Sequence, residues 1–511
     1  MRKIVVLFLF IAFSLNAQRV VWDKIKGFPS LYGEGADLIT GGRGGTLFFI
    51  TSLANTEQAT FIPATTTTEA HYTGTLSGAL LMRNESLDIV PRVSGNVNGT
   101  DINITFSDQG NKTYHGHLAP EGGIAHINGK IQIANTSNII IRYLTSRNGN
   151  SAVLEQDDQL FINRSERIAL DHLSLGWSGD EIFNVFPGST PGITYGNIIV
   201  QHILFGQARF GHNTGAILGA WTFDTANSMP FPRGEIHMIL HKCFFSSEQS
   251  RMPNIGGRSG TEIRVHNNIG YGWVGRIINV NGDPRLDSFG NWYKVGPRTI
   301  SPATLSILNQ VQNIEVSGPT IYTAGNYVQG LFTDPNADNR QIWTMFDHTN
   351  STPVPNNYFM DTPLAVSEVG YFYTSASDAY REVISKRNVG NNRSTNSLGD
   401  PIVQFDVIDQ GYFDKFLNRE DTWQPESEWI HPTRLSNAFY TDTNWNSIYD
   451  PFESENNIVA STQIKEQYTW QGVTYVNKAG YNARDAWSFI VAGQIEPTIR
   501  NTNGNVKKSK I

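Results

Sequence analysis

Short apolar runs recur between residues 124 and 293 of the chain. Each run has the length of one short β-strand, ends in polar residues and is followed by turn-forming residues. The runs align on one position near their ends, at Tyr143, His172, His202, Lys242, Asn267 and Asn291. The steps between these positions are 29, 30, 40, 25 and 24 residues. This spacing indicates a repeat with one strand per unit and one long insertion.

A repeat of this kind predicts stacking, because one short strand cannot bury its own apolar face. Strands stacked at intervals of one coil form a parallel β-helix, so we expect an all-β fold of the right-handed parallel β-helix type. The 40-residue step predicts a long loop at residues 206–234. A β-sandwich is the alternative, but it needs hairpins, and Asn-Gly or Asp-Gly turns that join adjacent strands are sparse. The aligned positions are expected to stack as one structural column.

Beyond residue 300 the repeat is no longer visible. We therefore expect a β-helix domain over residues 18–300 and an irregular C-terminal extension over residues 301–511, packed on the β-helix or following it. Residues 377–385 read as a short helix. The stretch from Asp442 to Glu453 carries side-chain oxygens at loop positions 1, 3, 5 and 12. These are the spacings of a calcium loop, and an Asn-rich surface turn is the alternative.

The first 17 residues have the pattern of a secretory signal peptide. Arg2 and Lys3 precede an apolar run at residues 4–13, and small residues follow, so cleavage is expected near Ala17 and Gln18. An apolar run of this length is too short to span the roughly 30 Å of hydrocarbon in a bilayer. Later stretches are also too short or too polar. We expect a secreted, periplasmic or cell-surface protein without a membrane span.

Composition narrows the range of partners. The net charge of −7 argues against general binding of nucleic acid, and any anionic substrate then requires a local cationic site. The single cysteine, Cys243, excludes an internal disulfide. With 47 glycines and 17% charged residues, the composition is typical of an all-β protein with many turns. A monomer is the expected state.

One arginine stands on a constrained turn between two strand-like runs. Arg251 lies in the stretch Ser-Arg-Met-Pro-Asn-Ile-Gly-Gly at residues 250–257. The proline and the glycine pair favour a turn, which gives the guanidinium a defined direction. Taken alone, the same pattern also fits a surface arginine that caps a turn.

Two acidic pairs lie beside neighbouring strands. Asp157 and Asp158 precede one apolar run, and Asp180 and Glu181 follow the next. Asp158 and Asp180 are 22 residues apart, which is close to one coil, and side chains one coil apart lie about 5 Å from each other. Carboxylates at this distance repel each other unless a cation neutralises them, and hard oxygen ligands favour Ca²⁺. A solvated acidic rim is the alternative.

The order of these motifs resembles the pectate lyase family, polysaccharide lyase family 1, in the version common among secreted proteins of Gram-negative bacteria. The resemblance covers residues 28–300 and rests on residues 40–45, 157–158, 171–172, 177–181, 250–257 and 265–268. Residues 377–385 and 476–486 resemble the C-terminal tail appended to such proteins. The family has a parallel β-helix fold, which agrees with the fold expected from the repeat.

The resemblance implies an enzyme that cleaves the acidic polysaccharide polygalacturonate, the backbone of pectin, by β-elimination with Ca²⁺ as cofactor. It implies that Arg251 is the base that removes the C5 proton of the uronate. It also implies that the calcium ligands are among Asp157, Asp158, Asp180 and Glu181.

Two positions depart from the family pattern. Thr214 stands where a lysine that grips the uronate is expected, and Gly256 stands where a second arginine is common. Arg258, Arg209 and His212 are candidates to replace these cations in substrate binding. Two other functions remain open. One is a β-helix that binds glycan without cleaving it, and the other is a β-helical glycoside hydrolase that uses a pair of carboxylates.

Overall fold

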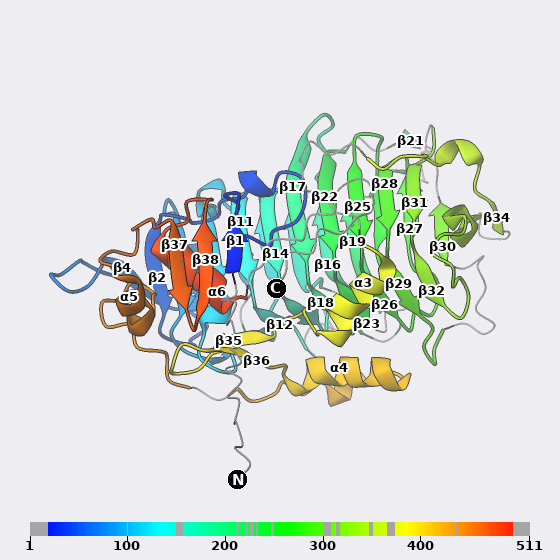
Figure 1. Ribbon diagram of the computed structural model, residues 1–511. Helices are drawn as coiled ribbons and strands as arrows, with labels where there is room; N and C mark the ends of the chain where they lie inside the picture. The colour runs from blue at the N-terminus through cyan, green and yellow to red at the C-terminus, as the bar shows by residue number, and fades with distance from the viewer. Residues whose placement is uncertain are drawn as a thin grey trace, which may run out of the picture.

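The computed structural model describes residues 19–99, 101–149, 157–209, 211, 214–219, 223–224, 229–230, 233–246, 250–299, 308–312, 317–346, 351–364, 374–434 and 437–493. The expected signal peptide at residues 1–17, His212 and part of the predicted loop at residues 206–234 lie outside the described residues. The described strands form a long stack of coils (Figure 1).

Three long sheets run along this stack (Figure 1). The first sheet contains, in spatial order, β3 (Ala59–Ile62), β4 (His71–Gly74), β2 (Thr46–Ile50), β5 (Leu87–Pro91), β8 (Lys112–His115), β11 (Ser137–Arg142), β14 (Glu166–Asp171), β17 (Thr194–Gln201), β22 (Glu235–His241), β25 (Glu262–His266), β28 (Arg285–Phe289) and β31 (Thr320–Ala324). The second contains β32 (Tyr327–Gln329), β29 (Trp292–Lys294), β26 (Ile269–Tyr271), β23 (Phe244–Ser246), β18 (Leu204–Phe205), β15 (Ser174–Gly176), β12 (Thr145–Arg147), β9 (Ile124–Ile127) and β6 (Gly95–Asn98). The third contains β34 (Ser351–Pro353), β33 (Trp343–Phe346), β30 (Asn309–Gln312), β27 (Asn279–Gly282), β24 (Asn254–Gly257), β19 (Thr214–Gly219), β16 (Glu181–Phe186), β13 (Leu160–Asn163), β10 (Ile131–Ala134) and β7 (Ile102–Ile104).

Parallel pairing at intervals of one coil confirms the predicted parallel β-helix. Leu170 of β14 pairs with Ile141 of the preceding coil and with Val200 of the next. All three side chains are buried. Apolar positions of successive coils therefore lie one above another and form a continuous core. Among the described strands of the three sheets, antiparallel pairing is confined to β3 with β4 and β33 with β34.

The predicted column lies at the turn between the first and second sheets. Its members share a left-handed backbone conformation, with φ of 56°, 56°, 53°, 52° and 58° at Tyr143, His172, His202, Lys242 and Asn267. The rings of Tyr143 and His172 stack with centroids 4.6 Å apart, and those of His172 and His202 stack at 4.5 Å. The shared backbone conformation and the ring stacking confirm that these turn positions lie in register.

Asn291 does not belong to this column. The pairing of β25 with β28 places Gly290 opposite Asn267 and Asn291 opposite Asn268. Gly290 takes the left-handed conformation with φ of 61°. The backbone N–H of Asn268 donates to the side chain of Asn291 at 2.8 Å. The expected alignment is therefore wrong by one residue here, because the glycine occupies the turn position and the asparagines form a separate ladder.

The β-helix continues beyond the expected boundary at residue 300. The strands β30, β31, β32 and β33 each pair in parallel with a strand of the preceding coil. Ahead of residue 124, β5 and β8 pair in the same way. The later strands were not predicted because they carry few aliphatic residues, as in β30, which reads Asn-Gln-Val-Gln.

The C-terminal extension contains helices and small sheets beside its irregular segments. Its helices are α3 (Ala376–Tyr380), the π-helical turn η7 (Arg381–Ser385), α4 (Val407–Asn418), η8 (Glu426–Glu428), α5 (Asp450–Asn456) and α6 (Ala483–Val491). Its strands are β35 (Arg393–Thr395), β36 (Pro401–Val403), β37 (Gln467–Trp470) and β38 (Val473–Asn477), the last of which pairs with the N-terminal β1 (Arg19–Trp22). The remaining short elements are η1 (Ala36–Leu38), α1 (Leu76–Leu81), η2 (Ser107–Gln109), η3 (Gly116–Leu118), β20 (Phe223–Asp224), β21 (Met229–Pro230), η5 (Asn339–Ile342) and η6 (Asn356–Tyr358). No helix in the described part of the chain has the length and apolar character needed to cross a membrane.

The extension packs along the side of the β-helix. On the second sheet, Phe413 and Phe416 of α4 lie 5.4 and 5.5 Å from Phe244, measured between ring centroids. On the outer face of the first sheet, Trp487 of α6 belongs to the same buried apolar cluster as Ile140. The extension therefore covers two faces of the coils (Figure 1).

Candidate active site

The candidate residues lie where turns lead from the second sheet into the third. Asp158 precedes β13, Glu181 begins β16, Thr214 begins β19 and Arg251 precedes β24. Glu181 pairs with Thr214 in the third sheet, and Thr214 forms a β-bridge with Ser250. Because successive coils stack in register, these turns bring residues that are distant in sequence to one edge of the third sheet.

Three of the predicted acidic residues gather in what we call the acidic cluster: Asp158, Asp180 and Glu181. One carboxylate oxygen of each lies within 4.8 Å of the others. Asp158 accepts hydrogen bonds from the backbone N–H of Glu181 at 3.1 Å and from the side chain of Asn184 at 2.9 Å. Burial, together with the charges of Asp180 and Asp157, raises the pKa of Asp158 to about 7. The gathered negative charge thus disfavours the ionised form of Asp158.

Asp157 is not part of the acidic cluster. Its carboxylate forms an ion pair with Lys130 at 2.7 Å. Its backbone carbonyl accepts hydrogen bonds from the N–H groups of Gly179 at 2.9 Å and Asp180 at 3.1 Å. Of the four expected ligands, the structure therefore brings three together, and the fourth holds the turn that carries Asp180.

Arg251 lies directly against the acidic cluster. Its Nη1 atom contacts the Oε1 atom of Glu181, and its backbone is left-handed with φ of 66°. Burial lowers the pKa of Arg251, whereas the charges of Asp180 and Asp158 act in the opposite direction. The turn thus directs a partly buried guanidinium at a group of carboxylates.

Thr214 also contacts the acidic cluster. Its Oγ1 atom donates a hydrogen bond to Oε1 of Glu181 at 3.2 Å. The family pattern has a lysine at this position. In this chain the hydroxyl of Thr214 supplies a hydrogen bond but no positive charge. Gly256 lies within β24, and it contributes no side chain where a second arginine is expected.

Arg276 is a cation near Arg251 that was not predicted from the sequence. Burial and the charge of Arg251 lower the pKa of Arg276. Within the described residues, its Nε atom is buried without a hydrogen-bond partner. Arg276 follows Arg251 by 25 residues, which is also the step from Lys242 to Asn267 in the same coils. The spacing of the repeat was the signal that could have identified it.

Arg209 and Arg258, two further residues expected to bind substrate, lie at different distances from the acidic cluster. Arg209 lies on the turn after β18, where its backbone N–H donates to the carbonyl of Ser178 at 3.0 Å. Arg258 follows β24, so a four-residue strand separates it from Arg251, and four residues of strand span about 13 Å. His212 lies outside the described residues. Arg209 is thus close to the turn of the acidic cluster, and Arg258 is at the far end of its strand.

The acidic cluster fits a hard divalent cation. Its donors are carboxylate oxygens, which Ca²⁺ prefers, and a cation between them relieves their mutual repulsion. One further group among the described residues has three side chains spaced for a metal: Asp171, His172 and His202. In that group Asp171 already pairs with Arg142 at 3.0 Å and with His172 at 2.8 Å. His172 and His202 belong to the buried column of the fold, and Asp171 is the strand residue that pairs with it.

Hydrogen bonds join residues within the stretch from Asp442 to Glu453 to one another. The carboxylate of Asp442 accepts from the backbone N–H groups of Asn446 and Ser447, both at 3.0 Å. The carboxylate of Glu453 accepts from the side-chain amides of Asn444 at 3.1 Å and Asn446 at 2.6 Å. These hydrogen bonds fit both an Asn-rich turn and a calcium loop, so calcium binding by this stretch stays a prediction.

Similarity to known proteins is visible in the sequence. No protein-family model matches the chain. The chain is 24% identical over 319 residues to a protein named probable pectate lyase C from Emericella nidulans, and the match covers 61% of each chain. It is also 24% identical over 334 residues to probable pectate lyase C from Aspergillus fumigatus, with 64% of each chain covered. The match thus spans less than two thirds of the length of these fungal relatives.

Solved structures similar to the chain include the major allergen from cedar pollen and a pectate lyase from Bacillus sp. N165 in complex with trigalacturonate. The allergen is 18% identical with a TM-score of 0.47, over 70% of this chain and 92% of that one. The Bacillus protein is 16% identical with a TM-score of 0.39, over 68% of this chain and 94% of that one. Over about three fifths of its length, the chain is therefore similar in sequence to proteins named probable pectate lyase.

Proposed function

We propose that the protein is a polysaccharide lyase that cleaves pectic polygalacturonate by calcium-assisted β-elimination. The observation that carries this proposal is the contact between Arg251 and the acidic cluster at one edge of the β-helix. The similarity to proteins named pectate lyase supports it. Carboxylates able to hold a cation and a partly buried guanidinium are the two components that elimination from a uronate needs.

The chemistry begins at C5 of the uronate, which is next to the carboxylate. Removal of the C5 proton leaves an electron pair that forms the C4–C5 double bond. The C4–O bond to the neighbouring sugar then breaks, and the departing oxygen takes up a proton. Neutralising the carboxylate charge makes the C5 proton more acidic, because the developing negative charge is delocalised onto that group.

Asp158, Asp180 and Glu181 are the residues that we propose to hold the calcium ion. Bound there, Ca²⁺ supplies a Lewis acid for the uronate carboxylate. A chain with a net charge of −7 repels a polyuronate overall, so binding requires local positive charge. The guanidinium group of Arg276, which neighbours Arg251, provides that charge.

Arg251 is the residue that we propose to remove the C5 proton. Because an arginine side chain is ordinarily protonated, this role requires surroundings that lower its pKa. Burial already lowers the pKa of Arg251, and the opposing effect of Asp180 and Asp158 weakens when their charges are neutralised. Arg251 is also next to a second cation: burial and the charge of Arg251 lower the pKa of Arg276, because two neighbouring guanidinium charges repel each other.

The contact between Arg251 and Glu181 argues against the glycoside hydrolase alternative. Glycosidases use a pair of carboxyl groups as their catalytic residues, and such a hydrolase assigns no role to this contact.

One observation favours non-catalytic glycan binding as a second candidate. Thr214 offers Glu181 a hydroxyl where the family pattern has a lysine, and Gly256 replaces a second arginine. A protein that keeps the acidic cluster but lacks these two cations can still hold a uronate through calcium. It then lacks the charges that orient the sugar for proton removal.

One assay separates the three functions. The purified protein is incubated with polygalacturonate in the presence of calcium or of a chelator, and the ultraviolet absorbance of the 4,5-unsaturated product is followed. The proposed lyase gives a rise in absorbance that the chelator abolishes. A hydrolase gives new reducing ends without that absorbance, and a binding protein retains the polymer without either change.

We expect Asp180→Asn to weaken calcium binding by about tenfold or more, or about 1.4 kcal/mol. The substitution removes one carboxylate from the acidic cluster but preserves the size of the side chain, so the fold should persist. Titration calorimetry with Ca²⁺ measures the effect. The matched control is Asp157→Asn, because the adjacent carboxylate pairs with Lys130 outside the cluster. A larger effect in the control would show that the cation binds elsewhere.

We also propose that the protein is exported and acts outside the cytoplasm. The support is the basic, apolar and small-residue pattern of residues 1–17. N-terminal sequencing of protein recovered from the medium or the periplasm is expected to begin at Gln18. An intact Met1 in that fraction would contradict the cleavage.

A further inference from the structure

Residues 421–434 of the extension, which we call the crossing segment, run along the turns between the second and third sheets. Three side chains of the segment and the backbone of Gln424 contact turns of four different coils. The contacts are Trp423 with Arg298, Gln424 with Gln207, Trp429 with Trp177 and His431 with Asn128. As the segment proceeds toward its C-terminus, its partners come from progressively earlier coils. One of these four turns, the turn of Trp177, carries Asp180 and Glu181 of the acidic cluster.

The central contact of the crossing segment is an aromatic pair. The rings of Trp429 and Trp177 stack with centroids 5.7 Å apart and planes inclined by 4°. The ring of His431 lies 5.0 Å from that of Trp177. Trp177 is 0% exposed and Trp429 is 5% exposed. A buried stack of this kind restricts the position of both rings.

Trp177 opens the turn that leads to the acidic cluster. Its backbone N–H donates to the carbonyl of Gln207 at 2.5 Å. The hydroxyl of Ser178 donates to the carbonyl of Asp180 at 2.9 Å, within the same turn. The turn is short and internally hydrogen-bonded, so it links the position of Trp177 closely to those of Asp180 and Glu181.

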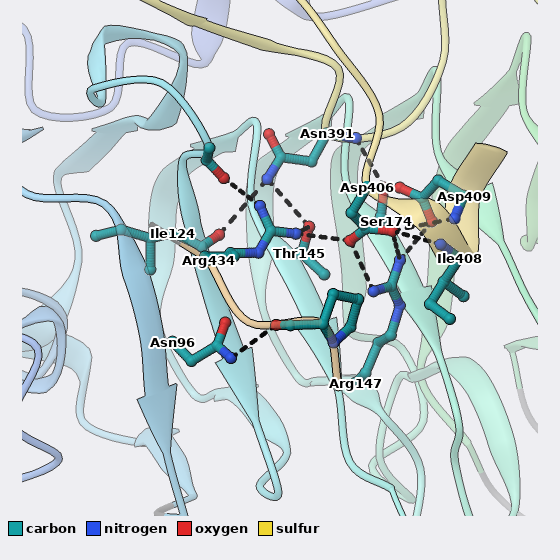
Figure 2. A network of polar contacts seen from close by, with 12 residues as sticks. Asn96, Ile124, Thr145, Arg147, Ser174, Asn391, Asp406, Ile408, Asp409 and Arg434 are labelled. Atoms are coloured by element: carbon teal, nitrogen blue, oxygen red, sulfur yellow. Dashed lines mark hydrogen bonds and ion pairs between the residues drawn. The ribbon is translucent and has the colours of Figure 1, made fainter. Parts of the chain in front are cut away.

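The extension is anchored beside this turn by a buried ionic network (Figure 2). Arg147 of β12 donates to Asp406 at 2.8 Å and to Asp409 at 2.5 Å. Arg434, at the end of the crossing segment, donates to Asp406 at 2.7 Å. The guanidinium of Arg147 also lies 5.6 Å from the centre of the Trp177 ring. Arg147 therefore contacts both the carboxylates that anchor the extension and the turn that leads to the acidic cluster.

We propose that the crossing segment positions the acidic cluster, with Trp429 as a positioning residue that acts through Trp177. This inference rests on the proposed calcium site, and it gives the C-terminal extension a role in cation affinity that the β-helix alone does not supply. Groups that orient metal ligands without binding the metal change affinity by about 10- to 100-fold when they are removed. Trp429 fits this description, because it holds the ligand-bearing turn from outside.

The substitution Trp429→Leu in the full-length protein tests this role. It removes the stacked ring but keeps an apolar side chain. We expect the Kd for Ca²⁺, measured by titration calorimetry, to rise by about tenfold or more. The calcium concentration for half-maximal lyase activity should rise by the same factor, whereas kcat at saturating calcium should stay within a few-fold. Trp429→Phe keeps a ring at this position and should recover most of the affinity.

The matched control is Trp470→Leu, the same change in β37 of the same extension. Trp470 packs against Trp487 at 5.5 Å, so the control should lower Tm without changing the Kd for Ca²⁺. Unchanged affinity in Trp429→Leu, or an equal loss in both variants, would overturn the inference while leaving the proposed function intact. A wild-type protein that binds no calcium would overturn both. If Trp429→Leu does not fold, His431→Ala decides: weaker calcium binding supports the inference, and unchanged binding overturns it.

Discussion

Replacing Arg251 with lysine is expected to lower kcat on polygalacturonate by about 10²- to 10⁴-fold, or about 3–5 kcal/mol of barrier. Lysine keeps the positive charge but loses the planar fork and the reach of the guanidinium. KM should stay within a few-fold, because the acidic cluster remains to bind the uronate through calcium. Steady-state kinetics at saturating calcium, followed by the absorbance of the unsaturated product, measure both parameters.

Arg258→Lys is the matched control for this prediction. It makes the same change at the opposite end of β24, away from the acidic cluster, and should leave kcat within a few-fold. A near wild-type kcat in Arg251→Lys would assign the base to another residue, and Arg276 is the next candidate. A wild-type protein that binds polygalacturonate but never cleaves it would favour the binding function, with Thr214 and Gly256 as the cause.

The fold was predictable because one structural unit recurs. Each coil places an aliphatic residue at the same register, as at Leu170, Val200 and Leu240. The spacing of apolar runs therefore predicts stacking without knowledge of any contact. The coils after residue 300 were not predicted, because β30 and β31 carry only one branched aliphatic residue each, Val311 and Ile321. The backbones of these strands still pair in parallel with the preceding coil, although their sequences no longer show the apolar pattern.

The candidate site was predictable only where it follows the coil spacing. Asp158 and Asp180 are one coil apart and meet in the acidic cluster. Asp157 was expected to join them, but neighbouring residues of an extended backbone point to opposite sides, and its carboxylate pairs with Lys130. The stacking of Trp429 on Trp177 had no local signal, because the two residues meet only through the packing of the extension on the coils.

Replacing Arg147 with methionine is expected to destabilise the folded protein by about 3–5 kcal/mol. The change leaves Asp406 and Asp409 buried without one of their cations. Arg147 is 2% exposed and Asp409 is 1% exposed, so solvent cannot replace the lost partner. Burial alone would raise the pKa of Asp406, but the charges of Arg147 and Arg434 hold it well below its usual value. Chemical denaturation at neutral pH measures the loss.

Arg340→Met is the matched control for Arg147→Met. Arg340 pairs with Asp361 at 3.0 Å, and the side chain of Asp361 is 90% exposed. An exposed pair of this kind contributes about 1 kcal/mol or less. Equal losses in the two variants would show that the buried network stabilises the fold no more than an ion pair on the surface does.

The destabilisation by Arg147→Met should depend on pH. Burial and the charge of Asp406 already raise the pKa of Asp409 to about 6, and loss of Arg147 should raise it further. A carboxyl group whose pKa in the folded state exceeds its unfolded value of about 3.9 costs stability as pH rises through the folded pKa. The low pKa of Asp406 acts in the opposite sense in the wild-type protein, where its contribution to stability is lost as pH falls. Arg147→Met should therefore lose less stability at about pH 5 than at about pH 8. A loss that is independent of pH would show that the substitution does not change the protonation of the two carboxylates in the folded protein.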